Sequence, residues 1–235
     1  MKLNPQSFNR SLPLDVLKQQ LRTNGCSGCA LGEQKKLIGP VLYRGNPKAQ
    51  IMCVGEGPGL KEDELGETFV GPAGKKLDEI FKYIGIDTNN QCFLGNVVDC
   101  RPIAPSGSGK QNLPPKSEYV TACRPYLLHQ IEVINPSIIV AVGMQGLKGL
   151  FPNKIKSGDP LLKYVGQFFW SSYNKPVYII YHPSALLRSQ GDQEKSLFYR
   201  KKMVEHIDRF KEVMINQDGI NHPERVREIC QTTLL

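Results

Sequence analysis

The apolar residues of the chain fall into short continuous runs that are separated by longer stretches with a mixed pattern. Four such runs lie at residues 50–54, 92–98, 137–142 and 176–181. Apolar runs of this length predict buried strands. Residues 165–170 form a weaker run, which predicts an extra strand at the edge of the same sheet.

Between these runs the apolar residues recur at helical spacing. Leu77, Ile80, Phe81 and Ile84 mark one face of a helix over residues 74–84. Further helices are predicted over residues 117–134 and about 192–210, with shorter ones after 143 and from 184. Pro13 indicates the first turn of an N-terminal helix that ends near Gly25. Residues 102–115, rich in Pro, Ser and Gly, predict a loop.

Strands that alternate with helices pair in parallel through right-handed crossovers. The pattern therefore predicts an α/β fold, a three-layer α/β/α sandwich with a central, mainly parallel four-stranded sheet. We expect one domain over residues 1–212 and a C-terminal extension of unknown role over 213–235. Ligands bind at the carboxyl ends of the strands in such sheets. Glu56, Asn96 and His182 each stand at the end of a different strand, so they can converge on one pocket.

Composition and charge narrow the class of protein. The 235 residues are 40% hydrophobic and 22% charged, as in a soluble globular protein. A formal charge of +8 suits a polyanionic partner, because Lys and Arg near phosphates release condensed counterions. No apolar run is long enough for a membrane helix, and residues 1–10 do not resemble a signal peptide. We therefore expect a cytoplasmic protein with no membrane partner.

Seven cysteines in a cytoplasmic chain favour metal or redox use over disulfides. Cys26 and Cys29 have the CxxC spacing that lets two thiolates reach one metal centre, and Cys100 and Cys123 lie near the loop after the second strand. Four thiolates suit either a [4Fe–4S] cluster or a zinc ion. The other cysteines are interpreted as two buried strand residues and one unassigned tail residue, namely Cys53, Cys92 and Cys230.

A glycine-rich segment follows the first strand, with the sequence GEGPG from Gly55 to Gly59 and FVGPAG from Phe69 to Gly74. Glycines let the backbone approach a ligand closely and leave its N–H groups available. The same glycines would also serve a tight connection between strand and helix. Phe69 could stack on a flat base or belong to the core.

Two further motifs carry polar groups at strand ends. The Asn96 amide offers one donor and one acceptor, which match the edge of a pyrimidine, although it could also satisfy loop backbone. His182 could donate to a carbonyl oxygen that gains charge as a glycosidic bond breaks. Leu186, Leu187 and Arg188 after it could form a wedge against duplex DNA, or pack in the core at the start of a helix.

Taken together, these motifs resemble family 4 uracil-DNA glycosylases, the iron–sulfur branch of their superfamily. The resemblance covers residues 26–188 and rests on CxxC, GEGPG with FVGPAG, NVVDCRP, ACRPYL and HPSALLR, in that order. It implies a [4Fe–4S] cluster on four cysteines, Cys26, Cys29, Cys100 and Cys123. It also implies that Phe69 stacks on the base, Asn96 reads its edge and His182 hydrogen-bonds to it.

The chain departs from the family pattern at two places. Gly57 stands where the family usually has a small residue such as alanine, so Glu56 or backbone groups must position the water. Gln111 and Asn112 replace the usual Asn-Arg, and the loop through residues 106–110 is longer. A related branch forms a covalent uracil adduct through a histidine in this loop. No histidine occurs between Arg101 and Leu128, which disfavours that chemistry.

We therefore expect a monomeric enzyme that hydrolyses the glycosidic bond of deoxyuridine in DNA. Its catalytic residues would be Glu56, Asn96 and His182, and its substrate-binding residues would add Gly55, Gly57 and Phe69. Three alternatives remain open at this point: a DNA-binding protein that has lost catalysis, a glycosylase for another base, and a zinc-bound structural protein. Absorption spectroscopy separates the last from an iron–sulfur protein.

Overall fold

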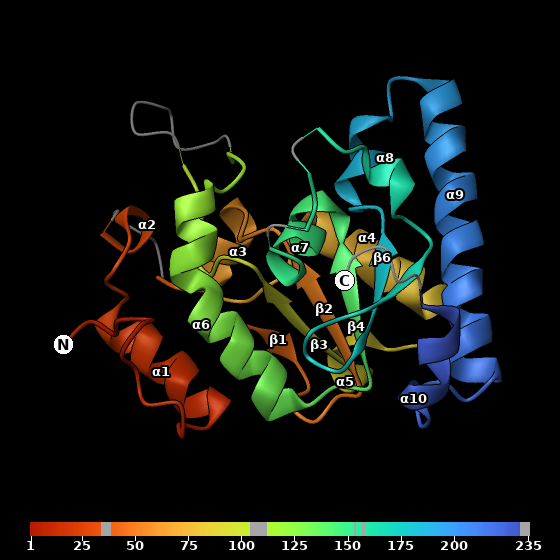
Figure 1. Cartoon of the computed structure of the whole chain (residues 1–235). Coiled ribbons are helices and arrows are strands. Elements are labelled where there is room, and N and C mark those ends of the chain that lie inside the picture. The colour runs from red at the N-terminus through yellow and green to blue at the C-terminus, as the bar shows by residue number, and fades with distance from the viewer. Residues whose placement is uncertain (34–38, 104–111, 153, 157, 231–235) are drawn as a thin grey trace.

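The computed structural model describes residues 1–33, 39–103, 112–152, 154–156 and 158–230. In the described residues a six-stranded sheet of order β1-β3-β2-β4-β6-β5 forms the centre, with helices on both sides (Figure 1). Its four inner strands are parallel: β3 (Cys92–Asn96), β2 (Ile51–Gly55), β4 (Ile138–Val142) and β6 (Pro176–Ile180). These are the four strands predicted from the apolar runs, so the mainly parallel α/β fold is confirmed.

Two short antiparallel strands extend this sheet, which therefore has six strands in the described residues where four main strands were predicted. β5 (Phe168–Trp170) pairs with β6 and is the expected edge strand. β1 (Arg44–Gly45) pairs with β3 and was not predicted. A strand of two half-buried residues is too short to show an apolar pattern. Its pairing is set by the neighbouring strand.

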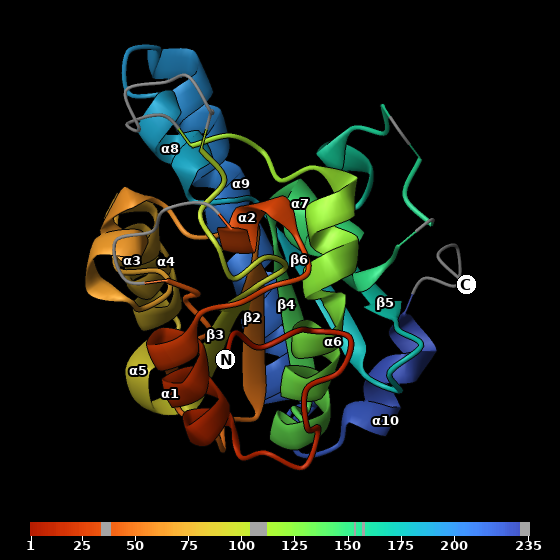
Figure 2. The same cartoon turned by 90° about the vertical axis from the view of Figure 1, so that its left-hand side faces the viewer.

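Helices cover both faces and produce the three predicted layers (Figure 2). The first face packs against α1 (Leu14–Asn24), α6 (Ser117–Ile134) and α7 (Gly143–Leu150), and the second against α4 (Pro72–Tyr83) and α9 (Gln193–Lys211). Successive strand residues alternate between the two cores: Met52 and Val54 enter the first, and Ile51 and Cys53 the second.

The connecting segments are short and mostly helical. They comprise α2 (Ala30–Glu33), α3 (Leu60–Leu65), α5 (Thr88–Gln91), α8 (Ser184–Arg188), α10 (Pro223–Val226), 3-10 turns at Leu161–Lys163 and Arg227–Ile229, and a π-helical turn at Glu212–Asn216. Met214 and Val226 are buried in the second core, so the described part of the C-terminal segment packs on the same sheet. None of the helices described is long and apolar enough to cross a membrane.

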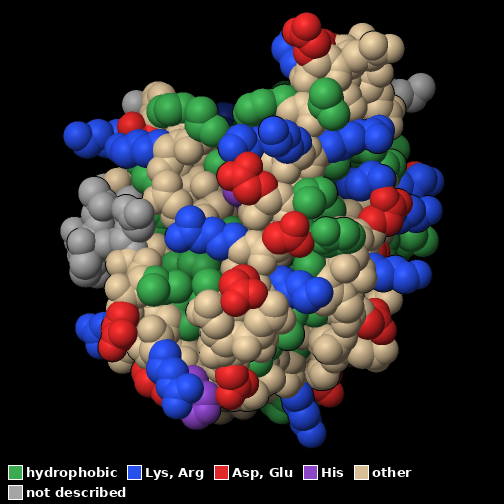
Figure 3. All heavy atoms as spheres, turned by 90° about the vertical axis from the view of Figure 1, so that its right-hand side faces the viewer, with side chains coloured by type: hydrophobic (Ala, Val, Ile, Leu, Met, Phe, Trp, Pro, Cys, Tyr) green, Lys and Arg blue, Asp and Glu red, His purple; other side chains and the backbone are tan. Residues whose placement is uncertain are grey.

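The surface on the α9 side carries many cations. Figure 3 shows Lys and Arg side chains in a band across the upper part of this face, with apolar side chains between them. Lys75, Arg200 and Lys201 are exposed, and they form no ion pair with any described residue. The positive charge expected from composition is therefore partly uncompensated on α4 and α9.

The contact between α4 and α9 gives a test of the second core. Phe81 is fully buried and its ring centre lies 6.1 Å from that of Phe210. Phe81→Ala should lower the free energy of unfolding by about 3–5 kcal/mol, because it removes a large apolar side chain and leaves a cavity. Tyr83→Ala, on the exposed side of the same helix, should change it by less than about 0.5 kcal/mol. Urea denaturation of both variants measures the difference, and equal losses would contradict this packing.

Candidate active site

A cavity of about 590 Å³ opens at the carboxyl ends of the parallel strands. Glu56 enters it from the loop after β2, Asn96 from the last position of β3, and His182 from the loop after β6. The structure thus brings together the three polar groups that the sequence placed at three strand ends. The remaining walls are the glycine-rich segments, the first turns of α3 and α4, the loop after β3 and the two ends of α8.

Gly55 allows an aromatic ring and an amide to meet at one point of this cavity. It pairs with Asn96 in the register of β2 and β3. A Cβ on Gly55 would lie 2.5 Å from Cζ of Phe69 and 2.6 Å from Oδ1 of Asn96. Both distances are shorter than any normal contact, so only glycine fits here. Both residues are more than nine-tenths buried, and both line the cavity.

Phe69 holds an unusual backbone conformation with φ of 55°, in the left-handed region that non-glycine residues seldom occupy. The first turn of α4 keeps it there, because a Cβ on Gly74 would lie 1.8 Å from the carbonyl oxygen of Phe69. Beside it, the Thr68 hydroxyl donates to the backbone carbonyl of Leu94, at 2.6 Å. The ring is therefore positioned by its own backbone and by contacts on both sides.

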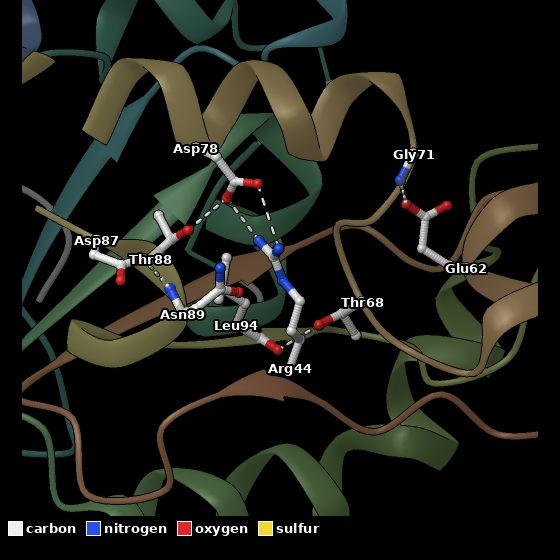
Figure 4. Close-up of polar contacts among 9 residues, drawn as sticks. All are labelled: Arg44, Glu62, Thr68, Gly71, Asp78, Asp87, Thr88, Asn89 and Leu94. Atoms are coloured by element: carbon white, nitrogen blue, oxygen red, sulfur yellow. Dashed lines mark hydrogen bonds and ion pairs between the residues drawn. The ribbon is translucent and has the colours of Figure 1, made fainter. Parts of the chain in front are cut away.

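Glu62 in α3 joins the two glycine-rich segments. Its carboxylate accepts hydrogen bonds from the backbone N–H of Gly71, at 2.7 Å, and from that of Gly59, at 3.1 Å. Figure 4 shows the Gly71 bond, together with the Thr68 bond to Leu94. The motifs of the sequence did not identify Glu62 as a site residue. Its position three residues after Gly59 is the spacing of a capping box and was the available signal.

A second polar network in Figure 4 connects β1 with α4. Asp78 of α4 pairs with Arg44 of β1, at 2.6 Å, and accepts a hydrogen bond from the Thr88 hydroxyl, at 2.5 Å. The pair joins the short edge strand to the helix that begins under the cavity. A part-buried pair with two hydrogen bonds holds geometry better than an exposed ion pair does.

The hydrogen bonds of His182 define its protonation. The backbone N–H of Ser184 donates to Nδ1, at 3.2 Å, and the Ser184 hydroxyl lies 2.8 Å from the same atom. Nδ1 is therefore an acceptor, and the proton of the neutral ring lies on Nε2. Burial, and then the nearby charge of Arg188, lower the pKa of His182 to about 4. The ring is neutral at physiological pH and offers one N–H.

Glu56 and Arg188 supply the charges beside His182. Burial raises the pKa of the Glu56 carboxyl, and the positive charge of Arg188 opposes this shift. Arg188 is exposed at the mouth of the cavity, at the end of α8. Leu186 and Leu187, which were interpreted with Arg188 as a wedge, are half-buried and line a different, smaller cavity. The structure separates the three residues of that motif.

The loop after β3 contributes a residue that the sequence identified only as a departure from the family pattern. Asn112 lines the cavity, and its Oδ1 accepts a hydrogen bond from Nε of the buried Arg101, at 2.7 Å. This bond turns the Asn112 amide nitrogen away from Arg101. Gln111 and the insertion at residues 106–110 lie outside the described residues.

The four cysteines of the proposed cluster approach one another from three segments of the chain. Cys26, Cys100 and Cys123 are buried and Cys29 is half-buried. Burial raises the pKa of Cys26 to about 11, with smaller contributions from Asp99 and Cys29. The pKa of Cys123 is raised first by burial and then by Asp99, Cys100 and Cys29. The four thiols thus lie within electrostatic range of one another.

The chemistry of the four thiols suits a thiolate-held metal centre. No disulfide links the described cysteines, and none of the His, Cys, Asp and Glu residues described forms a group of three or more that would hold a single metal ion. Buried thiols with raised pKa values need a cationic centre to ionise. By contrast, Cys53 and Cys92 are fully buried in β2 and β3, as predicted.

Comparison with known proteins agrees with this geometry. A sequence profile described as the uracil DNA glycosylase superfamily matches residues 42–208. The chain is 34% identical over 205 residues to the type-4 uracil-DNA glycosylase of Sulfurisphaera tokodaii, covering 86% of this chain and 85% of the relative. It is also 34% identical over 217 residues to that of Thermotoga maritima, covering 90% of this chain and all of the relative.

The protonation of His182 can be tested directly. With ¹⁵N-labelled histidine, NMR should show Nδ1 unprotonated and Nε2 protonated from pH 8 down to about pH 5, because the pKa of about 4 lies below this range. Between pH 6.5 and 4 the unfolded chain binds a proton that the folded ring does not, so this residue makes stability fall as pH falls. A proton on Nδ1, or titration near pH 6.5, would contradict the assignment.

Proposed function

The chain belongs to the uracil DNA glycosylase superfamily, and we propose that it hydrolyses the N-glycosidic bond of deoxyuridine in DNA, which releases uracil and leaves an abasic site. The observation that carries the proposal is the convergence of Phe69, Asn96 and a neutral His182 in one cavity. Its volume of about 590 Å³ lies in the range of cavities that enclose one small organic group. The names of the relatives support uracil as the substrate.

Recognition follows from the shape and the hydrogen-bonding groups of the cavity. The target nucleotide must leave the helix before its base can enter. Phe69 then stacks on the flat ring, while the Asn96 amide offers a donor and an acceptor to the edge of uracil. Because Asn96 lines the cavity, a bound base that does not pair with its amide would displace water without replacing its hydrogen bonds, and such a base is disfavoured. Gly55 and Gly57 let the base approach the backbone.

Catalysis follows from the charges. As the bond stretches, its electron pair leaves with uracil and the sugar becomes cationic. His182 donates from Nε2 to the uracil oxygen that gains negative charge, and Arg188 adds a positive charge nearby. Glu56 holds the water that attacks the sugar and stabilises the cation. No histidine lies between Arg101 and Leu128, so the mechanism is hydrolytic, without a covalent uracil adduct.

The proposal includes a [4Fe–4S] cluster on Cys26, Cys29, Cys100 and Cys123. When bound, the cluster supplies a structural cross-link and no redox step in turnover. Cys100 and Cys123 are the residues on either side of the loop that carries Asn112, so ligation would fix the base of this loop. All of the proposed site groups lie in one chain, which fits a monomer, and a DNA repair enzyme with cluster thiolates fits the cytoplasm.

The active-site assignment predicts different effects on excision and on binding. Asn96→Asp should cripple uracil excision, because a carboxylate lacks the amide donor. His182→Ala should slow single-turnover excision by about a hundredfold, the typical cost of losing one preorganised donor. DNA binding should change far less in both variants. The measurement is single-turnover cleavage of uracil oligonucleotides, with binding assayed in parallel. Parent-like rates in both variants would refute the site, and a parent that binds DNA without excision would refute the activity.

The cluster assignment predicts about four irons per chain in anaerobically purified protein, with a brown colour and broad visible absorption. Cys100→Ala should lose iron and stability. Cys53→Ala serves as the matched control, because Cys53 is equally buried but lies in β2, outside the thiol set. It should keep the iron. A colourless parent that contains one zinc per chain would contradict the cluster.

A further inference from the structure

A second cavity of about 240 Å³ lies beside the first and shares no lining residue with it. Its lining comes from three helices that pack against one another, α4, α8 and α9, and from the turn between α8 and α9. The residues are Lys76, Leu186, Leu187, Gln190 and Arg200. No acidic side chain of the described residues lines this cavity. Lys76 and Arg200 give it positive charge, and the two leucines give it an apolar surface.

The cations of this cavity are available to an anion. No described residue forms an ion pair with Arg200, which is exposed. Lys76 pairs with Glu79 one turn further along α4, and such a surface pair contributes little stability. The exposed Lys75 and Lys201 stand next to these residues in sequence, and the band of cations in Figure 3 crosses this side of the molecule. The site therefore carries a net positive charge.

The two cavities have common walls. Gly74 of α4 lines the first cavity and Lys76 the second, while in α8 Arg188 lines the first and Leu187 the second. The backbone of a DNA strand that delivers its base to the first cavity can cross this shared wall. Its neighbouring phosphates then pass over the second cavity. Lys76 and Arg200 suit a phosphate, the amide of Gln190 suits its oxygens, and the two leucines suit the apolar face of deoxyribose.

We propose that the second cavity binds the sugar–phosphate backbone next to the extruded nucleotide, with Lys76 and Arg200 as its phosphate ligands. The inference rests on the proposed function, because it takes the strand in the first cavity to be DNA. In this proposal Leu186 and Leu187 form the apolar surface of the cavity, against which the backbone lies.

The test uses Lys76→Gln and Arg200→Gln in the full-length protein. The probe is a duplex with one 2′-fluoro-deoxyuridine, whose electron-withdrawing fluorine disfavours the sugar cation and slows cleavage. Each variant should bind about threefold to tenfold more weakly at low salt. The slope of log affinity against log salt should fall by about 0.9 for each cation removed. Arg209→Gln is the matched control, since Arg209 is an exposed cation of α9 that lines a different cavity. Its slope should stay at the parent value.

A second arm separates direct contact from long-range attraction. Single strands are shortened to the uracil on one side or the other. For one of the two truncations, the difference between the parent and Arg200→Gln should vanish, because the contacted phosphate is gone. Parent-like slopes in both variants, or an equal loss in Arg209→Gln, would overturn the proposal. Reduced slopes with a parent that excises no uracil would support the phosphate site and refute the proposed enzyme activity.

Discussion

The absence of a side chain at Gly55 is the constraint on which the cavity depends. Parallel pairing of β2 with β3 sets Gly55 beside Asn96, and the Phe69 ring lies over the same point. Any Cβ there would overlap both groups. The cost of this arrangement is a left-handed backbone at Phe69, which α4 and the Glu62 carboxylate hold in place through Gly74 and Gly71. Phe69 and Asn96 are thus held in position by contacts within the protein.

Burial acts in opposite directions on the two kinds of ionisable group near this framework. It keeps His182 neutral, so that the ring offers an N–H without carrying a charge of its own. A neutral donor gains most from the charge that develops on the leaving base, because it does not attract anions strongly beforehand. Burial also keeps the thiols of Cys26 and Cys123 protonated, and only a bound cationic centre can reverse that preference.

The sequence predicted those parts of the fold in which a local pattern carries the information. The four buried strands and the helix of α6 have clear periodicity, and the parallel order follows from their alternation with helices. The convergence of Glu56, Asn96 and His182 was predicted because ligands bind at the carboxyl ends of parallel strands. Features set by more distant contacts were missed: the pairing of β1, and the hydrogen bond that the Glu62 carboxylate accepts from Gly71, nine residues further along the chain.

The motif from His182 to Arg188 shows why residue type alone did not settle orientation. Leu186, Leu187 and Arg188 were predicted to form a wedge against duplex DNA, and the structure places these residues on two different cavities. In a helix of five residues, however, adjacent side chains point in different directions. Arg188 therefore faces the base cavity while Leu187 faces the neighbouring one. Since α4 and α8 form walls of both cavities, a backbone held in the second is held at a fixed position relative to His182. Binding energy gained away from the reacting bond can then offset the cost of keeping the nucleotide extruded, a cost that a base-excising enzyme must meet.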